Sequence, residues 1–404
     1  MTGFRPSDWD DGPPLNAKLE KPLVFSFESL SRSEHLTEVS DIILINIAGQ
    51  DLLPILANFV FEYILTGKIC GLKGPIGDAM VEYGVSRFMK PSKCKKFRAQ
   101  TDEPLAILAL VKFFERRDLT LEKYLTTSLT TPDPSHRGIV FEAFGAYLLA
   151  LAFSGPTPLS KIFEFVPGNN VYAALQDEPA ELVMLKKDGD KFRTTPFNIK
   201  ANFRSNHVYG LSPSSIPETV EWLENPQGSA FCFPANAVGP DLIFVLRLTN
   251  DDTFLRVCVQ FKHTETLSPQ AWKKAIRTTN PYHFNSRKTD GNNSPASSNV
   301  MRDRLVDAIK NLGKGTEKAG PCGVLRVIIS HASSPNSNAL KEAAKENHPI
   351  ATVPLNRLGS DPHSDLGQTI LSLAKLSLQT PDLKRKNSDQ IAGAVPKRTR
   401  RETY

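Results

Sequence analysis

The spacing of apolar residues divides the chain into an N-terminal helical part and a longer mixed part. Apolar positions three and four residues apart predict helices over 52–66 and Glu103–Arg116. The Thr-, Pro- and Ser-rich residues 130–135 interrupt this pattern, as a hinge or domain boundary does. We therefore expect a loose leader over residues 1–21, because they are polar and Pro-rich without periodicity, and a small α-helical domain over 22–130.

The second part, from residue 136 to about 380, combines helical and strand periodicities. A helix over Gly138–Phe153 precedes irregular Pro-containing sequence, and two alternating runs, Asp241–Leu248 and Phe254–Lys262, predict a hairpin turning at Asn250–Asp252. The elements expected after it are a helix from Ser268, a helix over 300–312, a strand over Gly323–Ser330, a helix near 337–346, a strand over 350–355 and a helix near 364–379. This order predicts an α/β fold in which a central sheet is flanked by helices.

Composition excludes several classes of protein. With 404 residues, 40% of them hydrophobic and 23% charged, the chain matches ordinary globular usage and is long enough for two folded units. The five cysteines are widely spaced and form no Cys-x-x-Cys pair, so neither a disulfide framework nor a zinc ribbon is expected. The apolar runs over 42–65 and 138–153 are interrupted or too short to span a membrane, and no membrane partner is expected.

The predicted hairpin gathers polar side chains at one end. Side chains alternate faces along a strand, so Gln260 and Lys262 point the same way. A loop over 249–253 places Leu248 opposite Phe254 and Asp241 opposite residue 261, give or take one. A carboxylate, an amide and an ammonium group are therefore expected near one another.

The helix over Gly138–Phe153 is apolar almost all round and must be buried, yet it contains Glu142. An ionised carboxylate there costs several kcal/mol unless it is compensated. Glu142 is therefore neutralised, paired with a cation such as Arg137, or coordinating a metal. Gly145 and Ala146 follow on the same face and allow a close approach to the sheet.

These residues carry a resemblance to a known superfamily. A buried helix bearing a Glu, then Gly239-Pro240-Asp241 leading into a strand, then a strand ending Val259-Gln260-Phe261-Lys262, resembles the core of the PD-(D/E)xK phosphodiesterases, the restriction-endonuclease-like superfamily. Glutamine in place of the usual acid is similar to the Mrr-type QxK variant. The order of elements also resembles the C-terminal nuclease-like domain of Crinkler and RHS-type fungal proteins, and this resemblance implies a fungal effector or a protein associated with a mobile element.

In those proteins the nuclease-like domain follows a P-loop ATPase module, and the segment 40–130 is similar to the tail of such a module. The sequence has no Gly-x-x-x-x-Gly-Lys-Ser/Thr, so no nucleotide-binding site is expected. The resemblance implies a restriction-endonuclease-like mixed sheet flanked by helices over 136–380.

The resemblance also implies a catalytic set of Asp241, Gln260, Lys262 and Glu142. Asp241, Gln260 and Glu142 would bind Mg²⁺ or Mn²⁺ through oxygen atoms, and Lys262 would position the attacking water and stabilise charge on the phosphate. The implied activity is metal-dependent endonucleolytic cleavage of DNA. Because Gln260 brings no charge, a second reading stays open: an inactive protein that keeps the nuclease fold and binds DNA or protein partners.

The net charge of +6 combines a slightly acidic body with two basic segments. Six cations and no acid lie between residues 87 and 98, and this run is typical of a phosphate-binding track or of a solvated loop: Arg87, Lys90, Lys93, Lys95, Lys96 and Arg98. The polar tail over 381–404 contains two basic clusters, Lys384, Arg385 and Lys386, then Lys397, Arg398, Arg400 and Arg401. The tail resembles a bipartite nuclear localisation signal, although a polyanion-binding tail has a similar composition. We therefore expect a nuclear protein with DNA and an import receptor as partners.

Overall fold

A computed structural model describes most of the chain between residues 53 and 358. The described residues are 53–67, 77–78, 81, 87–89, 98–100, 104–129, 134–166, 175–189, 191–199, 208–226, 228–262, 268–284, 295–313, 323–330, 348–354 and 357–358. The expected leader, the helices near 337–346 and 364–379, and the basic tail lie outside them.

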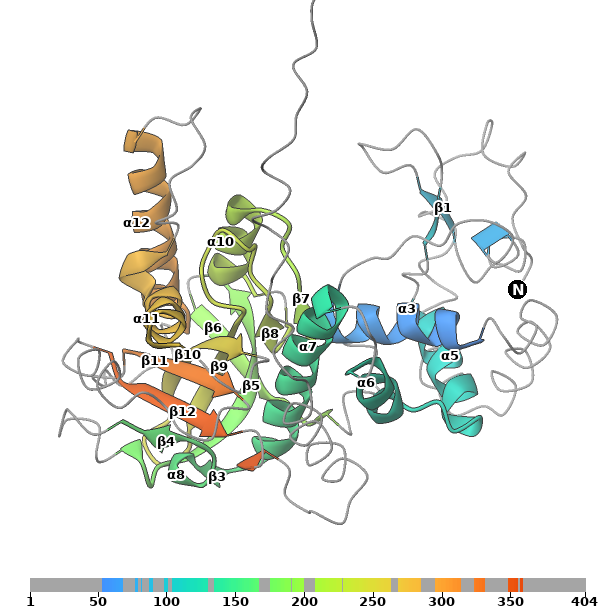
Figure 1. Cartoon of the computed structure of the whole chain (residues 1–404), viewed down its shortest axis with the longest axis horizontal. Coiled ribbons are helices and arrows are strands. Elements are labelled where there is room, and N and C mark those ends of the chain that lie inside the picture. The colour runs from blue at the N-terminus through green and yellow to red at the C-terminus, as the bar shows by residue number, and fades with distance from the viewer. Residues whose placement is uncertain are drawn as a thin grey trace, which may run out of the picture.

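The fold is mixed α/β, with a curled sheet of parallel and antiparallel strands (Figure 1). Its centre is the antiparallel pair β9 (Leu242–Leu248) and β10 (Thr253–Lys262), followed by β11 (Val324–Ser330) and β12 (Ile350–Pro354), each parallel to the strand before it. On the other side of β9 lies antiparallel β5 (Pro179–Asp188). Short strands extend this frame: β3 (Thr157–Pro158), β4 (Glu164–Phe165), β6 (Lys191–Pro196), β7 (Gly210–Leu211) and β8 (Phe231–Cys232).

The sheet curls because β5 and β9 each change partners along their length. Residues 180–182 of β5 pair with β9, whereas 183–188 pair with β6. Similarly, residues 246–248 of β9 pair with β5, whereas Ile243 and Phe244 pair with β8. Most of these short strands fall in sequence that we expected to be irregular.

The central hairpin turns one residue earlier than expected. Leu248 lies opposite Thr253, not Phe254, because the reversal is completed within residues 249–252. Asp252 has a φ of 53°, a left-handed conformation that Asp tolerates better than most residues, and this closes the tighter turn. The whole register of the hairpin is therefore shifted by one residue.

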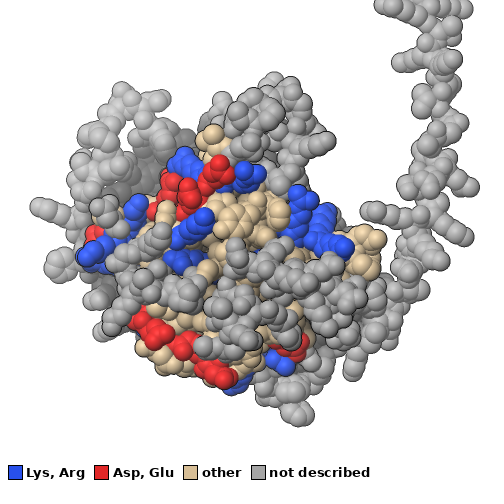
Figure 2. Space-filling model, turned by 90° about the vertical axis from the view of Figure 1, so that its left-hand side faces the viewer, with Lys and Arg blue, Asp and Glu red and all other residues tan. Residues whose placement is uncertain are grey.

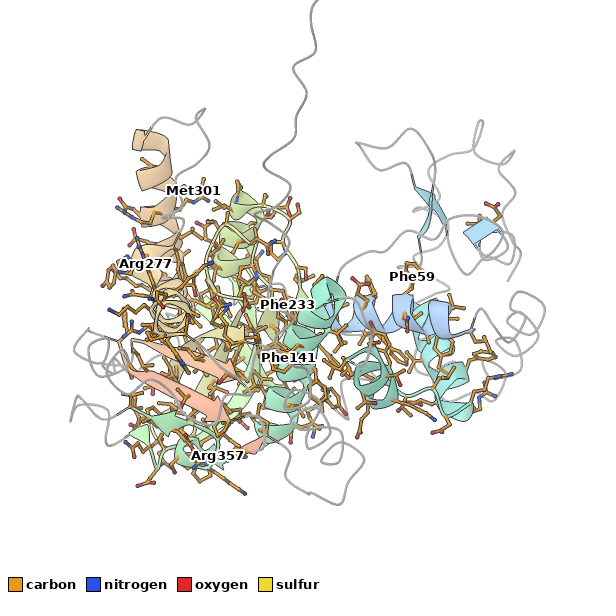
Figure 3. The ribbon with its side chains drawn as sticks, in the orientation of Figure 1. Phe59, Phe141, Phe233, Arg277, Met301 and Arg357 are labelled. Atoms are coloured by element: carbon orange, nitrogen blue, oxygen red, sulfur yellow. The ribbon has the colours of Figure 1, made fainter. Side chains whose placement is uncertain are left out.

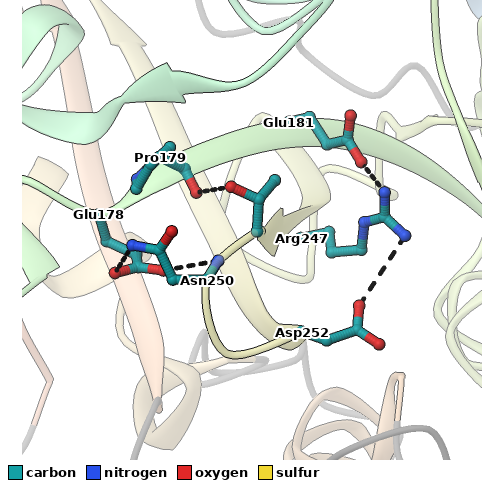
Figure 4. Close-up of polar contacts among 7 residues, drawn as sticks. Glu178, Pro179, Glu181, Arg247, Asn250 and Asp252 are labelled. Atoms are coloured by element: carbon teal, nitrogen blue, oxygen red, sulfur yellow. Dashed lines mark hydrogen bonds and ion pairs between the residues drawn. The ribbon is translucent and has the colours of Figure 1, made fainter.

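Polar contacts fix the turn of this hairpin to β5 (Figure 4). The backbone N–H and side-chain amide of Asn250 donate to the carboxylate of Glu178 at 3.1 and 3.0 Å. Arg247 donates to Glu181, the residue opposite it on β5, and lies 3.8 Å from Asp252. Glu181 is buried, so this is a shielded pair. The turn end of β9 and β10 is thus held in place by charge and hydrogen bonds.

Helices cover both faces of the sheet. α7 (Pro134–Ala152) packs on the face that carries Leu255, Val257 and Val259, and α10 (Ile216–Glu224) and α12 (Pro295–Asn311) pack on the face that carries Cys258. α11 (Pro269–Thr278) covers β11 and β12 through Trp272, Ala275 and Ile276. Figure 1 shows α7 and α11 on opposite sides of the strands. The single turn α8 (Leu159–Ile162) and the 3₁₀ helix η4 (Pro281–His283) complete this part.

α7 approaches the sheet at a glycine. A Cβ on Gly145 would lie 2.1 Å from Cε1 of Phe261, so only glycine fits there. One turn earlier, Phe141 meets the same ring edge-on at 5.9 Å between centroids. The glycine thereby brings the face of α7 that carries Glu142 close to the end of β10.

The N-terminal helices pack on the outer side of α7. α3 (Leu53–Thr66), α5 (Pro104–Arg116) and α6 (Leu121–Leu129) share one buried cluster with α7 and the sheet. Phe61 of α3 stacks on Tyr124 of α6 at 5.5 Å, and the backbone N–H of Tyr209 donates to the carbonyl of Ile64 at 2.7 Å. The apolar core therefore continues across the boundary expected at 130–135, and α7 is apolar all round because it is covered on two sides.

A two-stranded antiparallel sheet lies within the segment expected to be helical. β1 (Arg87–Met89) pairs with β2 (Arg98–Gln100), with Arg87 opposite Gln100. No helix among the described residues is both long enough and apolar enough to cross a membrane.

Candidate active site

Asp241 lies directly before β9, next to the end of β10. Leu242, the first residue of β9, lies opposite Val259, and the N–H of Asp241 donates to the carbonyl of Val259 at 2.8 Å. Gln260 and Lys262 alternate with Phe261 along β10, so they share a face of the sheet. Asp241 thus stands beside residues 259–261 of β10, within the one-residue margin of the expected pairing.

Asp241 and Gln260 are joined by hydrogen bonds. Oδ2 of Asp241 accepts from the backbone N–H of Phe261 at 2.8 Å and from Nε2 of Gln260. An ionised carboxylate can only accept, so the amide nitrogen of Gln260 faces it. Oε1 of Gln260 accepts in turn from the hydroxyl of Thr278, the last residue of α11. The amide of Gln260 is therefore oriented from both ends.

Glu142 lies on α7 and is partly buried. The pKa of its carboxyl is raised from 4.5 to about 8, mainly by burial and secondly by the charge of Asp241, against the opposing charge of Lys262. Burial likewise raises the pKa of Asp241 to about 6, against the opposing effects of Lys262 and of the hydrogen bonds from Phe261 and Gln260. The two carboxyls interact electrostatically, although Glu142 lies on α7 and Asp241 lies just before β9.

Lys262 ends β10 and interacts with both carboxylates. Burial lowers the pKa of its ammonium group; Asp241 and Glu142 raise it, and Lys274 of α11 lowers it. The site thus contains one partly buried cation and two partly buried carboxyl groups. The raised pKa values of the carboxyls show that Lys262 does not fully offset the cost of burying them in their ionised form.

Asp241 and Glu142 carry the carboxyl oxygen atoms of the site, and oxygen ligands suit Mg²⁺. Because the pKa of Glu142 is raised to about 8, this carboxyl would have to lose its proton to bind a cation near neutral pH. The third expected ligand is neutral, and its oxygen is held by Thr278. Within the described ranges no group of three or more His, Cys, Asp or Glu could hold a metal, so the candidate site depends on Asp241 and Glu142.

The expected catalytic residues therefore lie together, whereas the basic segments lie elsewhere. Arg87 and Arg98 are on β1 and β2, the other four cations of that run are outside the described residues, and so is the tail. Comparison of the chain with known protein families, with curated proteins and with solved structures found no match.

Two residues of the site were missed from the sequence: Thr278 and Lys274, both on α11. Ser268 caps this helix by accepting from the N–H of Ala271, and Pro269 is its first residue, as expected. Gly239 has a φ of 145°, and a Cβ added to it would lie 2.7 Å from the carbonyl oxygen of Thr278. Glycine in the Gly-Pro-Asp sequence thus lets the entry to β9 pack on the end of α11, but nothing in the sequence identifies Thr278 as its neighbour.

Proposed function

We propose that the chain is a Mg²⁺-dependent DNA endonuclease with a restriction-endonuclease-like core, or a descendant of one. The observation that carries this proposal is that Asp241, just before β9, is hydrogen-bonded to Gln260 of β10 and interacts electrostatically with Glu142 of α7 and Lys262 of β10. The order of a helix, antiparallel strands, a helix and a parallel strand also supports the resemblance seen in the sequence.

The residues of the site divide the work of phosphodiester hydrolysis. Asp241 and Glu142 would hold Mg²⁺ or Mn²⁺, which when bound neutralises phosphate charge and acidifies a water molecule. Phe261 N–H and Gln260 orient Asp241 through hydrogen bonds to Oδ2. Water attacks phosphorus, the bond to the leaving oxygen breaks, and that oxygen takes up a proton.

Lys262 would act on the phosphate. Its ammonium group interacts electrostatically with Asp241 and Glu142 and would stabilise the negative charge that develops on the phosphoryl oxygens. Burial lowers its pKa, which also favours exchange of a proton with the attacking water.

We further propose that the protein acts in the nucleus and that an import receptor recognises the tail over 381–404. This rests on the two basic clusters in the sequence. Deleting 381–404 from a fluorescent fusion should abolish nuclear accumulation, and nuclear entry of the deleted protein would refute this assignment.

A cleavage assay tests the main proposal. Wild type should nick supercoiled DNA with Mg²⁺ or Mn²⁺ and not with EDTA, and single-stranded, duplex and branched substrates should be compared. Asp241→Asn, Asp241→Ala and Lys262→Ala should each lose at least about 100-fold in rate, as expected when an electrostatic contributor to the transition state is removed. Asp251→Ala, at the exposed far end of the hairpin, and Lys187→Ala, on β5, are matched controls that should cleave normally.

Two results would refute an endonuclease. One is wild-type protein that binds neither Mg²⁺ nor DNA. The other is cleavage that survives Asp241→Asn unchanged, because the activity would then come from another site or a contaminant.

A second function is favoured by the hydrogen bonds of Gln260. Its oxygen is held by Thr278 and its nitrogen by Asp241, which leaves two carboxylates for a metal. An inactive protein that binds DNA or protein partners through the same fold is the alternative. It predicts DNA binding that persists in Asp241→Ala and no metal-dependent nicking by wild type.

A further inference from the structure

The helix α11 presents a basic face beside the candidate site. Its ten residues, Pro269–Thr278, include three cations and no acidic residue. Lys273, Lys274 and Arg277 are exposed, whereas Trp272, Ala275 and Ile276 are buried against β11 and β12. Packing against the sheet therefore holds the cationic side of this helix toward solvent.

The basic face begins at the site itself. Lys274 lies four residues before Thr278 and so on the same side of the helix as the hydroxyl that holds Gln260. Lys274 also interacts electrostatically with Lys262. Lys273 and Arg277 form the adjacent row, about 6 Å apart along the axis. Cations thus extend from Lys262 onto the surface of α11.

The positive surface continues beyond the end of α11. η4 packs against both α11 and α12, and its Tyr282 is 46% exposed. The Tyr282 ring stacks on His348 at 5.6 Å between centroids, and Nζ of Lys310, on α12, lies 5.4 Å from the ring centroid. The ring thereby places a fourth cation at the end of the row.

The other cations of α12 have acidic neighbours. Arg304 forms a two-pronged pair with Glu224 of α10 at 3.1 and 2.9 Å, and Arg302 lies 3.3 Å from Asp303. Figure 2 shows the molecule from the side of α11 and α12, with Lys and Arg side chains across the middle of this face and acidic groups above and along the lower edge. In Figure 3 Arg277 is labelled on the same side, away from α7 and Phe141.

A row of exposed cations that ends at a phosphodiesterase site fits a polyphosphate. We propose that Lys273, Lys274, Arg277 and Lys310, the α11 surface, bind the phosphate backbone of DNA and lead it to Lys262. This inference rests on the proposed function, because that function supplies the reason for a strand to enter the site. It assigns the main DNA contact to α11 and not to the run between residues 87 and 98.

Salt-dependent binding tests the α11 surface. Binding of labelled duplex and single-stranded DNA to the full chain would be measured in EDTA from 0.05 to 0.3 M salt. Changing Lys273, Lys274 and Arg277 together to Gln should flatten the slope of log affinity against log salt by about 3 and weaken binding at 0.15 M by about 100-fold, since each phosphate contact contributes about 0.9 to the slope. The matched control changes three exposed lysines of β5 and β6 to Gln: Lys186, Lys187 and Lys191.

A footprint on wild-type protein gives an independent answer if the triple variant folds poorly. Bound DNA should slow acetylation of Lys273 and Lys274 several-fold and leave Lys186 and Lys187 unchanged. Equal acetylation with and without bound DNA would overturn the inference.

The outcomes separate the two proposals. The inference is overturned if the α11 variant binds DNA as wild type does, or if binding is lost only when Lys93, Lys95 and Lys96 are changed to Gln. In either case the endonuclease proposal still holds if Asp241-dependent nicking is seen. Binding that requires α11 without metal-dependent nicking supports the inference and counts against the endonuclease. Tighter binding of RNA than of DNA would overturn the choice of partner.

Discussion

Replacing Glu142 by Gln should stabilise the protein at neutral pH in the absence of metal. The carboxyl of Glu142 has an ordinary pKa of 4.5, and burial beside Asp241 raises it to about 8. The folded protein favours the protonated carboxyl, so its contribution to folding stability is fully present below pH 4.5 and is lost as the pH rises through about 8. At pH 7 the cost is about 2 to 3 kcal/mol once the solvent contact of this partly buried side chain is allowed for. A glutamine of the same shape carries no such cost.

Thermal unfolding in EDTA between pH 5 and pH 8 measures this effect. Wild type and Glu142→Gln should melt at similar temperatures at pH 5, and the variant should melt about 5 to 10 °C higher at pH 7 to 8. Glu221→Gln, which removes one exposed charge from α10, should leave the melting temperature nearly unchanged at every pH.

Adding Mg²⁺ should close the gap, because the cation compensates the carboxylate of the wild type and gains less from the variant. A variant that melts below wild type at pH 8, or a gap that does not change between pH 5 and pH 8, would show that burial does not raise the pKa of Glu142, and the reasoning would fail.

Three further predictions concern the same region. Gly145→Ala should lower the free energy of unfolding by about 1 to 3 kcal/mol, because its Cβ would lie 2.1 Å from the buried Phe261 ring. Gly138→Ala, with no atom within 4 Å of the new Cβ, should raise the free energy of unfolding by about 0.5 to 1 kcal/mol. Denaturant unfolding that gives both changes the same sign would contradict this. Gln260→Glu adds a carboxylate next to Asp241, so the metal-free protein should melt lower at pH 8 and Mg²⁺ should raise its melting temperature more than that of wild type; an equal Mg²⁺ shift in both would argue against metal at this position. Because the two carboxyls have pKa values of about 6 and about 8, wild-type affinity for Mg²⁺ should fall on the order of 100-fold from pH 8 to pH 6 by calorimetry, and a pH-independent affinity would place the ion elsewhere.

The hairpin was predictable because its two strands are long, alternate regularly and flank an obvious turn. The strands expected over 241–248 and 254–262 are β9 and β10 within one residue at each end. Register was not predictable to better than one residue, since it depends on the length and conformation of the turn, in which Asp252 has a φ of 53°.

The short strands and the contacts between elements could not be predicted. β5 carries a continuous buried run from Ala180 to Leu185, followed by charged residues, and such a run shows no alternation because both of its faces are covered. The bond from Thr278 to Gln260 depends on how α11 packs on the sheet, which no local pattern specifies. The role of the four site residues stays a prediction until the variants are assayed.

The two-sided burial of α7 limits how the protein can be dissected. A fragment starting near residue 131 would keep the predicted nuclease core but would uncover the side of α7 that α3 and α6 now shield. An exposed apolar helix face of this kind promotes aggregation, so an insoluble or inactive fragment would say nothing about the chemistry of the site. The smallest piece suited to enzymology therefore retains α3, and the N-terminal helices act as part of the scaffold that positions Glu142.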